Sequence, residues 1–424
     1  MDYVYYEDAL NKTRIKIPQG NYIGCISYEE PEEIQWPKDY VQALRNPCGT
    51  ERLRDIASGR KKITILVSDY TRAAPAKILL PLLINELHQA GINESQITII
   101  IACGVHRPST QGEIVRIVGK DWAKRLRVIN HNALDLDSLT FLGKTGRGTP
   151  VWINNLVLES DLRIALGQIE PHEFAGFTGG RKSILPGVSG EETIRFNHSP
   201  DMIGHPLARP GVLKGNPVHE DMVEGALMAG LDFIVNVVLD RNLKITGIFA
   251  GDMVKAHKKG VDFVNSFSRI EISPQPDIII TTPGKPLDVD FYQSLKALIA
   301  VEPITFSETV IVFYSACHDG LGSMGEDMLG PFSGAATPEE VEVNLRNNYK
   351  IQMDQAFLLS RILEKGVKII AYSPNISAKV IKKMMMIPAS SVQEGLDLAL
   401  RLSTKRNPRV LIYPQAQRSL PVLT

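Results

Sequence analysis

Three apolar segments of the chain are each followed by polar side chains that could carry acid–base or anion-binding chemistry. Segments 63–68, 97–102 and 162–166 precede, in turn, Asp69 with Thr71 and Arg72, then His106, then His172. Ligands of parallel α/β sheets bind beyond the carboxyl ends of the strands. Because imidazoles titrate near neutral pH, the two histidines are candidate acids or bases. Polar turns are the alternative for each position alone, but three converging strand ends favour a site.

Residues 176–190 read GFTGGRKSILPGVSG and are rich in glycine. Glycine permits positive φ and lets the backbone approach a ligand closely. The segment nearly matches a phosphate-binding G-x-x-x-x-G-K-S loop, but Arg181 separates Gly180 from Lys182, so the match fails. One interpretation is that Arg181 and Lys182 face a bound anionic cofactor. The other is a turn-rich surface loop with solvated basic residues.

A possible metal ligand and a possible carboxylate clamp follow. The spacing of His198 from other histidines matches no standard zinc motif, yet a neutral imidazole is a good ligand for nickel, copper or zinc. Residues 288–300 have the apolar spacing of an amphipathic helix on which Gln293 and Lys296 share a face. That face could bind a carboxylate or could be solvated. Two later histidines are interpreted as ordinary polar residues: His205 and His219.

The elements that must position these residues alternate between strand-like and helix-like stretches, which is typical of an α/β protein with mainly parallel sheets. Strands are expected at 63–68, 97–102, 162–166, 233–239, 277–281, 309–314, 367–372 and 410–413. A helix is expected at 75–90, with Thr71 available to cap it. We predict two α/β lobes, 1–272 and 273–412, with a cofactor and substrate cleft between them. Residues 413–424 are expected to pack back onto the first lobe.

Composition narrows the class of protein. The chain has 424 residues, 44% hydrophobic and 22% charged, and its 47 basic and 47 acidic residues give a formal net charge of zero. This balance argues against nucleic acid or a membrane surface as the partner. The N-terminus does not read as a signal peptide, and no apolar run approaches the roughly 20 residues of a membrane span. The four cysteines are far apart, so we expect a cytoplasmic protein without a disulfide framework.

Five segments, taken together and in order, carry a resemblance to a known family. They are SDYTRAAP (68–75), CGVHRP (103–108), GQIEPHEFAGFTGGRKSILPGVSG (167–190), FNH (196–198) and PGKPLDVDFYQSLKA (283–297). In these segments the chain resembles the lactate racemase family, which carries a nickel-pincer nucleotide, a pyridinium-3-thioamide-5-thiocarboxylate mononucleotide that binds nickel. The resemblance implies a nickel-dependent isomerase, a 2-hydroxyacid racemase or epimerase, with two α/β lobes.

The resemblance also implies roles for individual residues. Lys182 would bond covalently to the cofactor, and His198 would be the protein ligand to nickel. His106 and His172 would be the acid–base pair. The residues implied to bind substrate are Arg72, Tyr292, Gln293 and Lys296. Those implied to contact the cofactor are Asp69, Thr71 and Arg181. The implied partners are a small 2-hydroxy acid and, transiently, the proteins that synthesise the cofactor.

The chemistry expected from this resemblance is reversible hydride transfer. Direct removal of a proton beside a carboxylate would leave a carbanion next to an anion. Removal of a hydride to the cofactor, while a base takes the hydroxyl proton, instead gives a transient 2-keto acid. Return of the hydride to the opposite face inverts C2. Each enantiomer places its hydroxyl differently, which accounts for two acid–base groups.

Several alternatives remain open at this point. The chain could be a C2 epimerase of a sugar acid such as gluconate, a non-catalytic cofactor carrier, or an NAD-dependent hydroxyacid dehydrogenase. The last lacks support because no G-x-G-x-x-G follows any expected strand. Lactate-specific members of the family place a tryptophan in the second lobe, whereas the corresponding stretch here is Asp354–Phe357. That difference predicts a larger or more polar 2-hydroxy acid than lactate.

Overall fold

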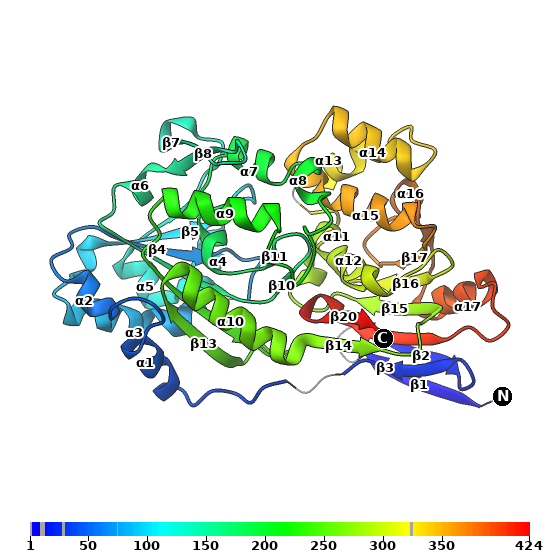
Figure 1. Ribbon diagram of the computed structural model, residues 1–424. Helices are drawn as coiled ribbons and strands as arrows, with labels where there is room; N and C mark the ends of the chain where they lie inside the picture. Colours follow the sequence, from blue (N-terminus) through cyan, green and yellow to red (C-terminus); the bar gives the residue numbers. More distant parts are fainter. Residues whose placement is uncertain (1, 9–12, 28–29, 74, 323–324) are drawn as a thin grey trace. The chain divides into compact units, whose positions relative to one another are not determined.

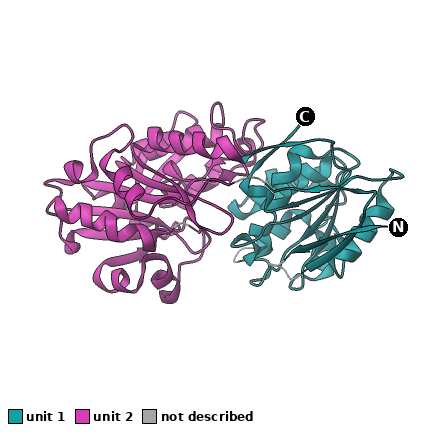
Figure 2. Cartoon of the chain, turned by 90° about the horizontal axis from the view of Figure 1, so that it is seen from below, with its two compact units in different colours: residues 1–29, 268–424 teal, residues 30–267 magenta. Residues whose placement is uncertain are grey.

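Two six-stranded sheets, one in each of two units, organise the chain in the computed structural model (Figure 1). The structure describes residues 2–8, 13–27, 30–73, 75–322 and 325–424. Unit 1 comprises Met1–Glu29 and Ser268–Thr424, and unit 2 comprises Glu30–Phe267 (Figure 2). The α/β class with mainly parallel sheets is confirmed. In the described part of the chain, no helix is both long and apolar enough to cross a bilayer.

The sheet of unit 2 has the strand order β13-β12-β9-β4-β5-β6. Its strands are β4 (Ile63–Ser68), β5 (Ile97–Ala102), β6 (Arg127–Asn130), β9 (Leu162–Gln168), β12 (Phe233–Leu239) and β13 (Ile245–Gly251). Only the β12–β13 pair is antiparallel. Since β4, β5 and β9 are parallel neighbours, their carboxyl ends lie at one edge. Four strands expected from the sequence are therefore confirmed, with β9 two residues longer than expected.

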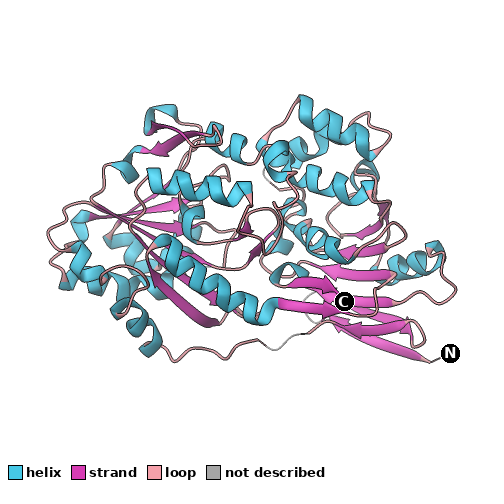
Figure 3. Ribbon diagram, viewed as in Figure 1, coloured by secondary structure: helices cyan, strands magenta, loops and turns pink. Residues whose placement is uncertain are grey.

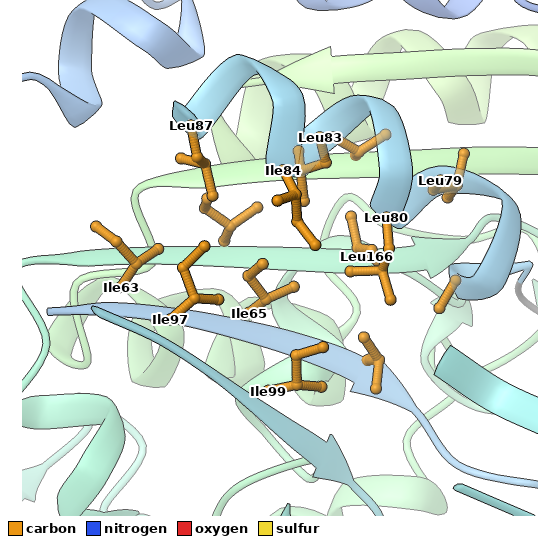
Figure 4. Packing of buried hydrophobic residues seen from close by; sticks show 14 of the residues in the cluster. Ile63, Ile65, Leu79, Leu80, Leu83, Ile84, Leu87, Ile97, Ile99 and Leu166 are labelled. Carbon is orange, nitrogen blue, oxygen red and sulfur yellow. The ribbon is translucent and has the colours of Figure 1, made fainter. Parts of the chain in front are cut away.

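Alternation along the strands gives this sheet two apolar faces, because successive side chains of a strand point to opposite sides. Ile63, Ile65 and Val67 of β4 join one core cluster, whereas Leu66 joins another. Helix α3 (Ala76–Gln89) covers the first face. Figure 4 shows its leucines directed at isoleucines of β4 and β5. Each such buried side chain stabilises the fold by about 1.5–3 kcal/mol.

The second face is covered by α9 (Pro217–Met228) and α10 (Met253–Ser268), which contribute Ala226, Met253 and Ala256 to the second cluster. Figure 3 shows the helices of the unit around its strands. The other helices of unit 2 are short: α1 (Lys38–Arg45), α2 (Leu53–Ala57), α4 (Gln111–Val118), α5 (Lys120–Arg125), α6 (Asn155–Leu158), α7 (Glu191–Asn197) and α8 (Pro200–Ile203). The remaining strands form two hairpins, β7 (Leu139–Lys144) with β8 (Pro150–Asn154) and β10 (Pro171–His172) with β11 (Gly176–Phe177).

The sheet of unit 1 is wholly parallel and has the order β18-β17-β16-β15-β19-β3. Its strands are β3 (Tyr22–Cys25), β15 (Ile278–Thr282), β16 (Val310–Tyr314), β17 (Lys368–Tyr372), β18 (Ile387–Pro388) and β19 (Val410–Pro414). The longer helices of the unit are α14 (Pro338–Asn347), α15 (Asp354–Glu364) and α17 (Val392–Leu402), with α13 (Gly325–Leu329) and α16 (Ala378–Lys383) shorter. Four more expected strands are confirmed here within one residue at each end.

The expected lobe limits need correction at both ends of the chain. The first 29 residues group with the C-terminal unit rather than with a lobe 1–272. The physical reason is that β3 hydrogen-bonds to β19, while Ile15 and Ile17 of β2 (Thr13–Pro18), which pairs with β1 (Tyr3–Asp8), enter the core of unit 1. Residues 413–424 also stay in unit 1, because β20 (Leu420–Leu423) pairs with β14 (Arg269–Ile272).

Candidate active site

Asp69 and His106 meet because β4 and β5 end in register. Ser68 is the Cα partner of Ala102, so the residues that follow both strands leave the sheet at the same edge. Oδ2 of Asp69 lies 2.6 Å from Nδ1 of His106. A carboxylate only accepts hydrogen bonds, so the imidazole proton sits on Nδ1 and Nε2 is the nitrogen that can exchange a proton. Asp69 is buried, whereas the His106 side chain is 25% exposed.

The other oxygen of Asp69 is held by Thr71. Oδ1 accepts from the Thr71 hydroxyl at 2.6 Å and from the Thr71 backbone N–H at 3.0 Å. Burial alone would raise the pKa of Asp69, but His106, Arg72 and Thr71 together lower it below its ordinary value. Arg72 in turn donates to the Thr71 hydroxyl at 3.0 Å. Thr71 therefore does not cap α3, as the sequence suggested, because its hydroxyl is directed at Asp69.

Arg107 fixes the His106 loop through contacts with Glu113 and Tyr70. Its guanidinium makes two 2.8 Å hydrogen bonds to the carboxylate of Glu113 and lies 3.9 Å from the ring centroid of Tyr70. Glu113 also closes a capping box with Thr110 at the start of α4. The pKa of Glu113 is lowered to about 2, chiefly by the hydrogen bond from Arg107. Arg107, which directly follows His106, is thus fixed by a planar, bidentate contact with Glu113. Tyr70, which directly follows Asp69, packs against the same guanidinium.

His172 stands on the β10–β11 hairpin, where it pairs with Gly176. Its Nδ1 lies 3.3 Å from the backbone N–H of Ala175 and 3.3 Å from Oε2 of Glu173. A neutral imidazole can accept from that N–H, whereas a protonated one is stabilised by the carboxylate. Both protonation states of His172 therefore find a partner at the same nitrogen. The sequence placed Glu173 inside the family motif but gave it no role.

The ring of Phe174 brings His172, Lys182 and His198 together. The His172 ring lies edge-on to Phe174 at 4.7 Å between centroids, and the His198 ring does so at 5.0 Å. Nζ of Lys182 lies 5.8 Å from the same ring centroid. Lys182 belongs to the 3₁₀ turn η3 (Gly180–Ser183), and His198 ends α7. Three residues that the sequence singled out separately thus surround one buried aromatic side chain.

The state of His198 suits metal ligation. The side chain is buried, and its pKa lies well below the ordinary value, first because of burial and second because of the charge of Lys182. A neutral imidazole keeps the lone pair that a borderline metal ion such as Ni²⁺ requires. Among the residues that the structure describes, no group of three or more His, Cys, Asp or Glu side chains could hold a metal. A metal at His198 would therefore take its further ligands from outside these side chains, and a buried neutral imidazole fits a cofactor that brings its own metal ligands.

One backbone hydrogen bond connects the loop of His106 with the loop of Lys182, and Gly179 packs closely against two strands. The N–H of Gly104, two residues before His106, donates to the carbonyl of Gly187 at 3.0 Å. Gly179 has φ of +81°, and a Cβ there would lie 2.7 Å from Oδ1 of Asn236 and 2.9 Å from the Gln168 carbonyl. The positive φ expected in this segment is confirmed at Gly179, whereas close approach to a ligand stays a prediction. Here the close neighbours are the protein's own strands.

Arg181 differs from Lys182 in its surroundings. The guanidinium is almost fully buried and donates to the carbonyls of Ala175 at 2.7 Å and Gly179 at 3.2 Å. It also lies 3.1 Å from Nε2 of His257. The side chain lines a cavity that Lys182 does not line. This environment is not the one expected for a cofactor contact shared with Lys182, because the Arg181 side chain lines a cavity that does not include Lys182.

A buried carboxylate that the sequence did not reveal supports the His198 end of the site. Asp221 of α9 is fully buried and accepts hydrogen bonds from the hydroxyls of Thr145 and Thr149 and from Nδ2 of Asn197, at 2.5, 2.7 and 2.7 Å. Asn197 directly precedes His198. The network thereby fixes the end of α7 to α9 and to the β7–β8 hairpin. The sequence carried no signal for it, because Asp221, Asn197 and the turn with Thr145 and Thr149 are far apart in the chain.

In unit 1, the predicted amphipathic helix at 288–300 is divided. Asp290 caps α11 (Phe291–Ser294) by accepting from the Gln293 backbone N–H, and α12 (Lys296–Val301) starts anew after Leu295. Gln293 and Lys296 are 3% and 8% exposed, so the solvated-face alternative is wrong. Oε1 of Gln293 is buried and has no hydrogen-bond partner in the described part of the chain, which leaves an acceptor for a ligand.

Tyr292 is held by the stretch in which lactate-specific relatives were expected to carry tryptophan. Its hydroxyl lies 2.9 and 3.0 Å from the two carboxylate oxygens of Asp354. Asp354 and the next three residues, through Phe357, are buried at the start of α15. The hydrogen bond fixes the orientation of the Tyr292 ring next to Gln293.

Comparisons with known proteins point to one family. The family model described as the lactate racemase N-terminal domain matches residues 8–211, and that of the lactate racemase C-terminal domain matches residues 272–417. A lactate racemase of Thermoanaerobacterium thermosaccharolyticum is 39% identical over 362 residues, 84% of each chain. One of Lactiplantibacillus plantarum is 37% identical over 391 residues, 91% of each chain.

Solved structures extend the likeness to the whole fold. The lactate racemase apoprotein of T. thermosaccharolyticum superposes with a TM-score of 0.90 at 34% identity, covering 99% of this chain and 100% of that one. A Thermotoga maritima protein superposes with a TM-score of 0.72 at 16% identity, covering 94% of this chain and 100% of that one. At that identity the second likeness concerns the fold alone.

Proposed function

The chain belongs to the lactate racemase family, and we propose that it interconverts the enantiomers of lactate with a lysine-tethered nickel-pincer nucleotide. Both named relatives are lactate racemases, which favours lactate over the larger or more polar acid expected from the missing tryptophan. The comparisons give no support to the sugar-acid epimerase. The observation that carries the proposal is the pair of carboxylate–histidine contacts on two loops, of which the His172 contact adjoins the Phe174 ring shared with Lys182 and His198.

The residues around Phe174 would hold the cofactor. Lys182 would form the covalent bond through its ε-amine, and His198 would ligate nickel as a neutral imidazole. When bound, the cofactor supplies an acceptor and donor for the hydride at C2. The buried aromatic ring between the lysine and the two histidines keeps water from the reacting atoms, which strengthens the electrostatic interactions there.

His106 and His172 would move the hydroxyl proton. With Nδ1 of His106 held by Asp69, Nε2 would take the hydroxyl proton of one enantiomer and would return it when that same enantiomer re-forms. His172 would act in the same way on the hydroxyl of the opposite enantiomer. Asp69 and Glu173 are positioning residues in this scheme, because each contacts its histidine and stabilises the imidazolium that forms.

The family resemblance assigns Arg72 and Lys296 to the substrate carboxylate. Arg72 can bind a carboxylate in a bidentate manner, whereas Lys296 acts as a compact charge. The free acceptor of Gln293 could take a hydrogen bond from the substrate hydroxyl. Tyr292, fixed by Asp354, would complete the group of substrate-binding side chains.

The decisive test is intact-protein mass and metal analysis after co-expression with the cofactor-synthesis proteins. We expect an added nucleotide mass at Lys182 together with nickel, and conversion of either lactate enantiomer to the racemate. Lys182→Ala should lose the added mass and His198→Ala should lose nickel. The matched controls Lys144→Ala and His205→Ala, both at exposed positions, should keep both. Attachment and nickel content unchanged in the first two variants would refute the assignment.

A further inference from the structure

A cavity of unit 2 is lined in part by Arg181, the neighbour of Lys182. Its volume is about 270 Å³, and its walls come from α9, α10, η3 and the segment just before α9. Both helices pack on the same face of the sheet (Figure 1). Lys182, His198 and the two candidate acid–base histidines are not among the lining residues. The cavity is therefore distinct from the proposed racemase site.

A buried cation without a carboxylate partner lies in the wall of this cavity. Arg181 is 1% exposed, and its contacts in the described part of the chain are carbonyls and His257. Its Nε is buried and has no hydrogen-bond partner among the described residues. Burial lowers the pKa of Arg181 to about 9, so the guanidinium is still charged at neutral pH. An uncompensated buried charge is costly, and an anion in the cavity would offset that cost.

Further groups of the cavity favour an anion. Nδ1 of His219 is buried and, among the described residues, has no hydrogen-bond partner; its ring stacks on that of His257 at 6.3 Å. Lys214 is exposed and contributes positive charge, whereas Lys258 is paired with Asp262 at 2.6 Å. The one acidic lining residue, Glu220, is already bound: its carboxylate accepts from Arg147 and from the Gly215 N–H, both at 2.8 Å.

The rest of the lining is aliphatic, which selects among anions. It is formed by four side chains: Leu213, Val223, Met253 and Val254. A free inorganic anion would leave this surface without a partner, whereas an acid with a hydrocarbon body would bury it. We propose that this cavity binds a small organic carboxylate, its head group directed to Arg181 and His219 and its chain against the aliphatic wall. This site is additional to the proposed racemase function and does not depend on it.

Isothermal titration of the full-length protein with sodium hexanoate tests the proposal. We expect saturable binding, and binding of the uncharged hexanamide weaker by about tenfold or more, because the charged hydrogen bonds are lost. Val254→Trp should fill the cavity and weaken hexanoate binding by about tenfold or more. Val343→Trp is the matched control, since both valines are exposed and on helices. It should bind as the wild type does.

Competing outcomes are separable. Arg72→Ala removes a proposed substrate-binding cation and should leave hexanoate binding intact. Loss of binding in Arg72→Ala with full binding in Val254→Trp would place the acid in the racemase site and overturn the proposal. If inorganic phosphate binds and hexanoate does not, the carboxylate assignment is overturned. Arg181→Gln is a further variant that should weaken hexanoate binding. If loss of the loop hydrogen bonds prevents it from folding, the comparison of Val254→Trp with Val343→Trp remains as the test.

Discussion

Replacement of Asp69 by asparagine tests whether His106 works through its carboxylate. The 2.6 Å contact between Oδ2 and Nδ1 is a charge-assisted hydrogen bond in a buried setting. Such a bond contributes about 1.5–3 kcal/mol. If it is stronger to the imidazolium formed in the reaction than to the neutral ring, its loss slows turnover by roughly 10- to 150-fold. The amide retains the size of the side chain, so the fold should persist.

The assay is the rate of interconversion of D- and L-lactate by cofactor-loaded enzyme, measured with nickel content and thermal midpoint. We expect Asp69→Asn to keep its nickel and its fold while kcat falls in both directions. Asp137→Asn, at an exposed position, is the matched control. A wild-type kcat in Asp69→Asn would refute the positioning role. A loss of nickel in parallel with rate would instead assign Asp69 to cofactor binding, as the sequence first suggested.

The remaining predictions concern the acid–base pair, the buried network and pH. His106→Ala and His172→Ala should each lower kcat by about 10²–10⁴-fold with the cofactor retained, measured by lactate interconversion and intact mass; wild-type rates would contradict the assignment. Asp221→Ala leaves three buried donors unpaired. It should lower the free energy of unfolding, measured in urea, by at least about 3 kcal/mol. An unchanged urea midpoint would show that water replaces the carboxylate. The pKa of Glu113 is lowered to about 2 from 4.5, so its stabilising effect is present above about 4.5 and is lost as pH falls through about 2. The urea midpoints of wild type and Glu113→Gln should differ at neutral pH and converge over that range; a constant difference would exclude linkage to this carboxyl.

The sequence predicted the strands well, because buried parallel strands are short apolar runs with little ambiguity. Segments 63–68, 97–102 and 233–239 match their observed limits. The lobe limits were less predictable, since Tyr22–Cys25 reads as an ordinary short segment until its pairing with β19 is seen. A parallel edge strand that is distant in the chain leaves no local signal, so its partner could not be predicted.

The candidate site shows a similar division. Residue type and position at strand ends were enough to select His106, His172 and Asp69, and the resemblance added the roles of Lys182 and His198. The sequence did not show that Phe174 brings three of these residues together, because a phenylalanine in a motif reads first as core. The sequence also did not show that Arg181 and Lys182 have different surroundings. In a 3₁₀ turn successive side chains diverge by about 120°, so adjacent residues have different surroundings.

The two carboxylate–histidine pairs are unequal, and this constrains how the acid–base assignment can be tested. His106 is partly exposed with its carboxylate at 2.6 Å, whereas His172 is buried with its carboxylate at 3.3 Å. The enantiomers of lactate have equal free energy, so kcat/KM must be equal in both directions for the wild type and for every variant. Comparing kcat/KM between directions therefore cannot tell which histidine serves which enantiomer. A change in the ratio of the two kcat values can make this assignment. Unequal pairs bind the two enantiomers with unequal affinity, so removal of one pair should alter KM for its own enantiomer.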